Sequence, residues 1–355
     1  MKVEKTVLAS FLLASVVFAP VSVKAAALNE IYVDFAVKVE TPPVLDGKLD
    51  DPQWNAAVVH TRFYEYFKPR PKKAAIRSEM RLLYTDKALW IGLVHHEERM
   101  DKLKVLSTVR DAVNWREDMS ELYIDPFGAA VGYTKLLVNS AGVIGDRRRI
   151  DGSVKLWEWS GDAWMAKTSR EKDRWTIELC LPYSDLQMPP VPGSSMWRLC
   201  VTRYQWTSGR FVGSVSSPGG SNKNTAGFGY LWFLPPGEKP DVGSLASIMQ
   251  GRVSAPWCTE IDGVMVYDLG EGVKSEPLSR LMALKRGELD ARLAAISLEG
   301  GGELEREFAA LKEECGQVKA GGDTLGDYAF ADEVLRQLNI FYWKNRLESE
   351  FGGGK

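Results

Sequence analysis

The sequence predicts a mainly β protein, an antiparallel β-sandwich followed by a smaller α-helical C-terminal region. Between residues 77 and 233, short runs of alternating apolar and polar residues each end at Gly, Pro, Asp, Asn or Ser, as β-strands do. Many such runs at short spacing, with no helical pattern between them, favour a sandwich over a sheet with helical crossovers. After residue 278, leucines recur every three to five residues, which is helical spacing.

The chain begins with a stretch typical of a cleavable signal peptide, residues 1–27. Lys2 and Lys5 precede an apolar run from residue 7 to residue 19, and small residues suited to cleavage follow it. The apolar run is shorter than the roughly 20 residues that a transmembrane helix needs. We therefore expect no membrane span and a secreted or periplasmic protein.

The next part of the chain, residues 28–234, is expected to form the sandwich. Asp46 and Gly47 are a hairpin signal, and Asp51 before a proline is typical of a helix start. We expect a single helical turn there, which places Trp54 in the end of the sandwich. The apolar alternation predicts strands over residues 80–84, 88–94, 119–124, 134–139, 175–181, 197–204 and 229–233.

Charge and cysteine usage exclude some functions. The net charge is −2 and there is no Lys/Arg stripe, so nucleic-acid binding is not expected. Residues 147–149 are three arginines flanked by aspartates, and we interpret them as a strand end or turn. The four cysteines match no metal-binding spacing. Cys180 and Cys200 lie in consecutive predicted strands, so that a disulfide between them and two free buried thiols are both open.

The clearest functional signal lies in residues 114–126, where Trp115, Asp118 and Glu121 occur within seven residues. A pyranose has an apolar face that stacks on an aromatic ring and an edge of hydroxyls that needs charged or amide partners. Stacking that removes about 100 Å² of apolar area contributes roughly 2.5 kcal/mol, whereas binding at about 1 mM requires roughly 4 kcal/mol. Hydrogen bonds to charged groups must supply the difference.

Each candidate residue also has a purely structural interpretation. Trp115 stands among polar residues, and a solvent-facing platform and a core position are about equally supported. Glu121 and Tyr123 share the strand face opposite the core face, where a carboxylate is as readily solvated as bound to a ligand. Asn139 ends an apolar strand and could instead cap a turn through its side chain.

Metal and cofactor binding have little support in the sequence. The adjacent Asp50 and Asp51 could bind calcium, but helix capping explains them with fewer assumptions. No other cofactor is expected. A haem-binding or redox sandwich would need a His and a Met that converge on one pocket. The sequence singles out no such pair among His60, His95 and His96.

Six sequence blocks follow one another along the predicted sandwich: P-V-L-D-G-K-L-D-D-P-Q-W (43–54), L-Y-T-D-K-A-L-W-I-G-L (83–93), W-R-E-D-M-S-E-L-Y-I-D-P (115–126), L-V-N-S-A-G (137–142), R-W-T-I-E-L-C-L-P (174–182) and G-F-G-Y-L (227–231). In this order, over about residues 40 to 233, they resemble the family 9 carbohydrate-binding modules. The resemblance implies a β-sandwich that binds saccharide without cleaving it, often beside xylan-degrading or other polysaccharide-active enzymes. It also implies structural calcium in some members.

In that family the ligand lies between two tryptophans and contacts a carboxylate, an arginine and an asparagine on neighbouring strands. The resemblance assigns Trp115 to the first tryptophan, Glu121 to the carboxylate and Asn139 to the asparagine.

This sequence departs from the family pattern at two positions. The position of the family's arginine holds Leu137, and the position of the second tryptophan holds Asn222. Either the affinity is lower, towards millimolar, or another residue such as Arg203 or Trp206 supplies the missing contacts.

The alternative function is a glycoside hydrolase acting on O-glycosyl bonds. Hydrolysis needs two carboxylates about 5 to 9.5 Å apart across the scissile bond. Glu121 and Asp125 would lie about 13 Å apart along one strand, which is too far. The same count does not exclude Asp118 and Glu121 as the pair. No catalytic residue is assigned, and non-catalytic binding is preferred.

The C-terminal part is predicted in two pieces. Residues 235–277 are interpreted as a linker and irregular segment, except for a strand-like run over 263–267. Residues 278–350 predict three amphipathic helices, separated by glycines at 300–302 and 321–322, in a bundle or coiled coil. Their apolar stripes suggest self-association or a protein partner, unless the bundle buries its own stripes.

The sequence therefore predicts a secreted protein that binds oligo- or polysaccharide, of plant type or otherwise, in support of polysaccharide breakdown. The expected partner is carbohydrate, with neither nucleic acid nor a membrane span. The candidate carbohydrate-binding residues are Trp115, Asp118, Glu121, Tyr123, Asn139, Arg203 and Asn222.

Overall fold

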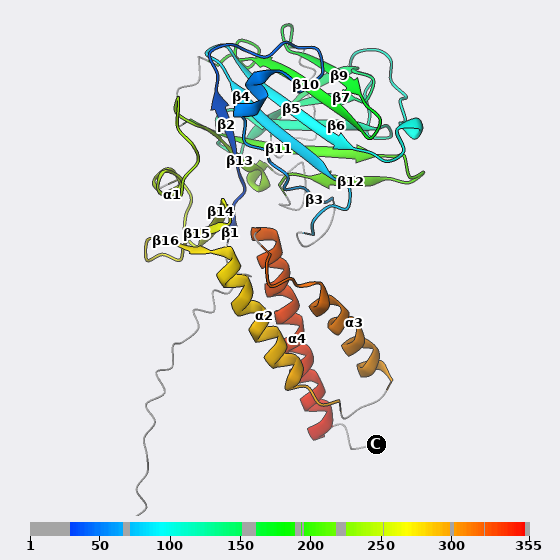
Figure 1. The fold of residues 1–355 in the computed structure, drawn as a ribbon, viewed down its shortest axis with the longest axis vertical. Helices are drawn as coiled ribbons and strands as arrows, with labels where there is room; N and C mark the ends of the chain where they lie inside the picture. The colour runs from blue at the N-terminus through cyan, green and yellow to red at the C-terminus, as the bar shows by residue number, and fades with distance from the viewer. Residues whose placement is uncertain are drawn as a thin grey trace, which may run out of the picture.

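The protein consists of a β-sandwich, a small second sheet and three long helices, which leave the sandwich at one end (Figure 1). The computed structural model describes residues 29–66, 72–150, 161–188, 193, 195–217, 225–250, 252–298, 302–322 and 324–351. The expected signal peptide over residues 1–27 and the candidate Asn222 lie outside the described residues. Among the helices described, none is long and apolar enough to cross a bilayer.

Two sheets form the sandwich, and one strand joins them. The first sheet has the order β8 (Ile144–Ile150), β7 (Gly132–Asn139), β6 (Met119–Asp125), β11 (Met196–Gln205) and β13 (Gly229–Phe233). The second has the order β4 (Ser78–Tyr84), β5 (Ala88–His96), β10 (Arg174–Pro182) and β9 (Met165–Arg170). Strand β2 (Val33–Lys38) pairs in parallel with β13 through its first four residues and with β4 through its last two. The other pairs are antiparallel, which confirms the predicted fold class.

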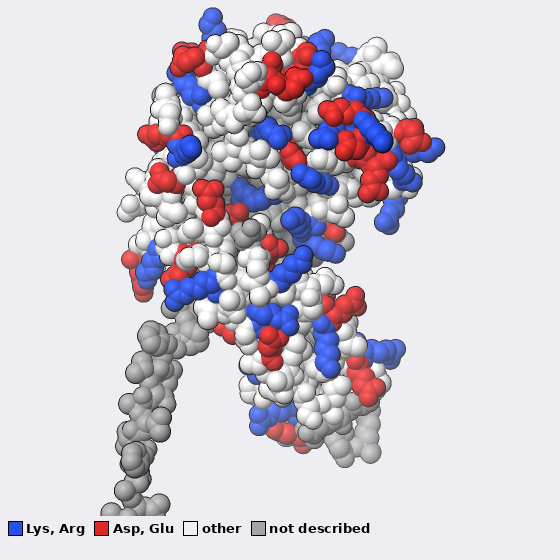
Figure 2. All heavy atoms as spheres, viewed as in Figure 1, with Lys and Arg blue, Asp and Glu red and all other residues white. Residues whose placement is uncertain are grey.

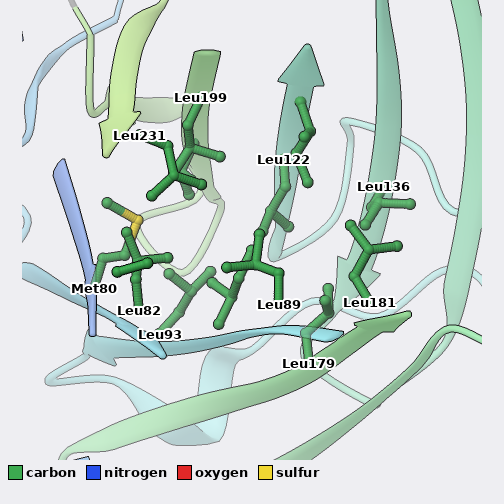
Figure 3. Packing of buried hydrophobic residues seen from close by; sticks show 14 of the residues in the cluster. Met80, Leu82, Leu89, Leu93, Leu122, Leu136, Leu179, Leu181, Leu199 and Leu231 are labelled. Carbon is green, nitrogen blue, oxygen red and sulfur yellow. The ribbon is translucent and has the colours of Figure 1, made fainter. Parts of the chain in front are cut away.

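The core lies between the two sheets because each strand alternates its side chains. Leu122 and Ile124 of β6 point inward, as their spacing predicts. Figure 3 shows apolar side chains of both sheets directed toward one another, among them Met80, Leu82, Leu89, Leu93, Leu122, Leu136, Leu179, Leu181, Leu199 and Leu231.

The arginine triplet 147–149 belongs to strand β8, not to a turn. It pairs with residues 133–135 of β7 at the free edge of the first sheet. Arg147 is 3.1 Å from a carboxylate oxygen of Asp111. Charged side chains on an edge strand hinder pairing with another chain, which explains why this strand lacks the apolar alternation of a central strand.

The predicted helical turn is a 3-10 helix, η2 (Pro52–Ala56), and it buries Trp54. The ring packs on the outer face of the second sheet, against Leu83, Trp90 and Cys180, and not in the end of the sandwich. Strand alternation explains the location, because Leu82 and Ile91 face the core and their neighbours in the sequence therefore face outward. Gly92 leaves the room that the Trp54 ring occupies.

The disulfide considered between Cys180 and Cys200 is absent, and the alternative with free buried thiols holds for both residues. Cys180 lies on the outer face of the second sheet and Cys200 on the outer face of the first. The two strands follow one another in the described chain but belong to opposite sheets, so their outward side chains point apart.

The segment 235–277, expected to be a linker and irregular, contains α1 (Val242–Met249), β14 (Trp257–Ile261), β15 (Val264–Asp268) and β16 (Val273–Pro277). These strands form a small sheet with β1 (Asn29–Glu30), which pairs in parallel with β14. Trp257, Ile261 and Val266 pack against Phe35 and Trp232 on the outside of the sandwich. The strand-like run predicted over 263–267 is β15, whereas the apolar patterns of β14 and β16, of five residues each, are too short to stand out in the sequence.

The three helices predicted at the C-terminus are α2 (Leu278–Ala294), α3 (Glu303–Gln317) and α4 (Leu325–Phe351). Lys285 pairs with Asp332 at 2.6 Å, and the Asn345 amide donates to the Ser297 carbonyl at 2.8 Å. Helices α2 and α4 therefore run in the same direction. Their shared core includes Leu289, Leu304, Phe308, Leu338 and Phe341.

Candidate functional site

Three aromatic rings meet at one end of the first sheet, and we call Trp115, Trp206 and Phe211 the aromatic shelf. The ring centroids of Trp115 and Trp206 are 5.8 Å apart, and Phe211 lies 6.3 Å from Trp115 and 5.7 Å from Trp206. Trp115 is 49% exposed, and the other two rings are partly exposed. The predicted platform residue is thus open to solvent and has two aromatic neighbours.

The strand register explains why these rings meet. Tyr204 of β11 pairs with Met119 of β6, so the chain leaves β11 where it enters β6. Trp206 follows β11, and its indole nitrogen donates to the Trp115 carbonyl at 2.9 Å. Phe211 precedes β12 (Val212–Val215), which folds back on β11.

The predicted acid Asp118 is buried beneath the shelf. Its two oxygens accept the backbone amides of Lys104, at 2.7 Å, and Trp206, at 2.9 Å. Burial raises the pKa of Asp118, against these hydrogen bonds, which lower it. The carboxylate therefore ties two loops together below the rings.

Glu117 is a functional candidate that the sequence pattern did not single out. It is buried and accepts the amides of Leu106, Ser107 and Asn114 and the Ser107 hydroxyl, at 2.7 to 3.1 Å. Burial raises the pKa of Glu117, but these hydrogen bonds outweigh it, and the pKa lies below its ordinary value. An ionised carboxylate thus organises the loop that carries Trp115.

Asn139 is buried and uses both ends of its amide within the protein. Its oxygen accepts the amides of Ala141 and Val143, at 3.0 and 2.9 Å, and caps the turn after β7. Its nitrogen donates to Glu117 and to the Ser107 carbonyl, each at 3.0 Å. Asn139 thus connects the β7 turn to the loop below the shelf.

Glu121 and Tyr123 share the outward face of β6, as the alternation predicts, but this face is covered. Glu121 accepts the hydroxyls of Tyr123 and Tyr204 and lies 2.6 Å from the Lys135 ammonium. Burial together with the neighbouring Glu121 charge raises the pKa of Tyr204. The cover includes Tyr66 and residues of β12, which pairs with β3 (Tyr64–Glu65).

Arg203 lies between the two sheets, with 1% of its surface exposed. Its guanidinium donates to the carbonyls of Arg77 and His96, at 2.9 and 2.8 Å, and is 3.3 Å from Glu97. Burial lowers the pKa of Arg203 to about 10, against the charges of Glu97 and Asp118. Since its nitrogens face inward, the structure does not bring Arg203 to the shelf.

The calcium candidates lie on the opposite side of the sandwich core, near η2. Asp50 is exposed, and Asp51 accepts the Val44 amide at 2.7 Å without capping the helix through its side chain. In the described part of the chain, no three His, Cys, Asp or Glu side chains are placed to hold a metal ion.

Basic side chains border the aromatic rings. The Lys104 ammonium is 4.5 Å from the Trp206 ring centroid, and the Arg116 guanidinium carbon is 5.4 Å from that of Trp115. Arg210 is exposed next to Phe211. These cations and Phe211 did not stand out in the sequence, although the run W-T-S-G-R-F after a predicted strand places aromatic and basic residues in one short turn.

No family model matches the chain, and no curated protein matches it. Among solved structures, it is similar to a family 9 carbohydrate-binding module from Caldicellulosiruptor kristjanssonii in complex with cellotriose, at 14% identity over 60% of this chain and 99% of that one, with a TM-score of 0.42. The complex of such a module with glucose gives the same identity and TM-score. A protein from Bacteroides uniformis, described as a candidate carbohydrate-binding protein, has 15% identity over 57% of this chain and 99% of its own, with a TM-score of 0.48. These are weak similarities of shape, and the site is therefore assigned from its own residues.

Proposed function

We propose that the aromatic shelf binds carbohydrate without cleaving it. The observation that carries the proposal is the Trp115 ring, which is half exposed although Trp206 and Phe211 contact it. An indole held outside the core by rigid loops offers a flat apolar surface to the C–H face of a sugar ring. If each of two rings removes about 100 Å² of sugar surface from water, stacking contributes roughly 5 kcal/mol.

The carboxylates near the shelf support a positioning role and not a catalytic one in this proposal. Glu117 and Asp118 accept backbone amides from three loop segments, and Asn139 joins Glu117 to the turn after β7. Glu121 and Tyr123 stabilise the covered face beneath Phe211 and Tyr204. Rigid support of this kind lowers the conformational entropy that binding must otherwise remove.

The polar contacts to the sugar must then come from side chains at the rim of the shelf. Lys104 and Arg116 are placed for this, because each lies against a shelf ring. Hydrogen bonds to charged groups contribute about 1.5 to 3 kcal/mol each. Together with stacking they are sufficient for binding in the range between about 1 mM and 1 μM.

The proposal includes export and a role in polysaccharide breakdown. Export is supported by the signal-peptide pattern of residues 1–27. Support of polysaccharide breakdown, including xylan and other plant-type polymers, follows from the resemblance of the sequence blocks to family 9 modules. The self-association predicted for the helices stays a prediction.

The test is retention of the full mature chain on a panel of glycans, with Trp115→Ala as the variant. We expect the variant to lose at least tenfold in affinity, because the stacking surface is removed. Trp343→Ala is the matched control, since Trp343 is 58% exposed on α4, away from the shelf. A wild-type protein that binds no glycan, or a Trp115→Ala variant that binds as tightly as wild type, would refute the proposal.

Reducing-sugar release on every glycan that binds decides between binding and hydrolysis. Retention without release is expected. Release that persists in Trp115→Ala and disappears in Asp118→Asn would instead support the glycoside hydrolase alternative.

A further inference from the structure

We propose that the aromatic shelf prefers acidic saccharides, those that carry carboxylates on their sugar rings. This inference rests on the proposed function and specifies its substrate class. Lys104 and Arg116 each lie against a different tryptophan of the shelf, and Arg210 is exposed in the turn that joins Trp206 to Phe211. The apolar surface of the site therefore has a rim of positive charge.

These cations are not neutralised by the protein. Within the described residues, the side chains of Lys104, Arg116 and Arg210 form no ion pair, in contrast to neighbours such as Lys102, which pairs with Asp101 at 3.5 Å. On the face shown in Figure 2, basic and acidic side chains are interspersed over the sandwich. The net charge of the protein is −2, so the three unpaired cations at the shelf are not a consequence of a basic protein.

The acids closest to the shelf in the sequence do not form ion pairs with these cations. Glu117 and Asp118 are buried and accept backbone amides, and Glu121 is buried among tyrosine hydroxyls and Lys135. Their arrangement directs negative charge inward and leaves nitrogen donors outside. The expected carboxylate contact to a neutral sugar is thereby replaced by donors that suit an anionic one.

A uronic acid matches both parts of this surface. Its ring has an apolar C–H face that can stack on an indole, and its carboxylate lies at the ring edge, where a guanidinium binds it in bidentate fashion. Charge-assisted hydrogen bonds are roughly twice as strong as neutral ones. Because Lys104 and Arg116 have no other polar side-chain partner among the described residues, they are free to turn from the ring faces to the rim when a sugar binds.

The experiment compares polygalacturonate with the same polymer after chemical reduction of its carboxyl groups. We expect wild-type protein to bind polygalacturonate about tenfold more tightly, and to lose that preference between low salt and about 0.5 M salt as the charges are screened. The double variant Lys104→Gln/Arg116→Gln should lose the preference and bind the two polymers with equal affinity. Lys172→Gln/Lys319→Gln, which removes the same charge at exposed positions elsewhere, should behave as wild type.

Each other outcome has a distinct meaning. Equal or tighter binding of the reduced polymer overturns the preference for acidic sugars but leaves the proposed function intact. Polygalacturonate binding that survives Trp115→Ala, or equally tight binding of polyglutamate, means that the cations attract any polyanion, and the inference fails. Binding to neither polymer and to no neutral glycan refutes the proposed function itself.

Discussion

Two tryptophans of this protein lie beside carboxylates, and the protein uses them in opposite ways. Trp54 is 2% exposed, and its indole nitrogen donates to Glu178 at 3.0 Å. Trp115 is 49% exposed, and the acids that follow it, Glu117 and Asp118, bind backbone amides and not the indole. The same residue types thus form a buried contact, Trp54 with Glu178, on one face of the sandwich and the open aromatic shelf at the end of the other sheet.

The two sites differ in the groups that donate hydrogen bonds to Glu178 and to Glu117. Glu178 accepts the amides of Asp46 and Gly47 as well as the Trp54 indole, so one acid fastens both the ring and the bend at Asp46 and Gly47 to the sheet. The hairpin that Asp46 and Gly47 predicted is wrong, because no strand flanks this bend within the described residues 29–66. Glu117 fastens a loop whose ring remains outside. An indole next to an acid in sequence or space can therefore be either buried or open to solvent, and the hydrogen-bond partners of the acid distinguish the two cases.

The largest expected effect is the loss of stability on substitution of the buried Trp54. Trp54→Ala removes a buried ring and leaves Glu178 without one donor, which should lower the free energy of unfolding by about 3 to 5 kcal/mol. For a sandwich of this size the melting temperature should fall on the order of 10 °C. Calorimetry of the full chain measures the change, and glycan retention at low temperature should be preserved. A fall in melting temperature of only about 1 or 2 °C, on the same scale, would show that the Trp54 ring contributes little to packing.

The contributions of Glu117 and Glu178 to stability should also depend on pH in opposite ways. The pKa of Glu117 in the fold lies below its ordinary value of about 4.5, so its contribution to stability is present above that value and is lost as the pH falls through the folded pKa. Burial raises the pKa of Glu178 above 4.5, despite its donors, so its contribution decreases as the pH rises through that raised pKa.

Chemical denaturation of Glu117→Gln and Glu178→Gln between pH 3 and pH 8 separates the two cases. The stability difference between wild type and Glu117→Gln should grow as the pH rises from 3 and then become constant. The difference between wild type and Glu178→Gln should shrink as the pH rises above about 4.5. Parallel curves for the two variants would contradict the assigned environments.

The fold could be predicted from the sequence to the extent that it depends on local alternation. Leu122 and Ile124 face the core because strand side chains alternate, and the seven predicted strands are present for the same reason. The crossing of β2 between the sheets could not be predicted, because it depends on partners in β13 and β4 that are distant in the chain.

The site was less predictable for the same physical reason. Alternation places Glu121 outward, but its burial depends on Tyr204, which lies 83 residues later and donates to it. Arg203 is next to Tyr204 in β11 and therefore points the other way, into the core. The sequence supports a platform and a core position for Trp115 about equally, and the loop contacts of Glu117 and Asp118 explain its exposure.

The smallest expected effect is that of the shelf on stability. Trp115→Ala removes a ring that is already half in water and that contacts two other rings, and an aromatic pair contributes about 0.5 to 1.5 kcal/mol. We expect the free energy of unfolding to fall by about 1 kcal/mol, several-fold less than for Trp54→Ala. Denaturant unfolding of both variants in parallel measures the ratio. Equal losses for the two would mean that the Trp115 ring is part of the core in solution, and the loss of glycan retention would then report unfolding and not a missing stacking surface.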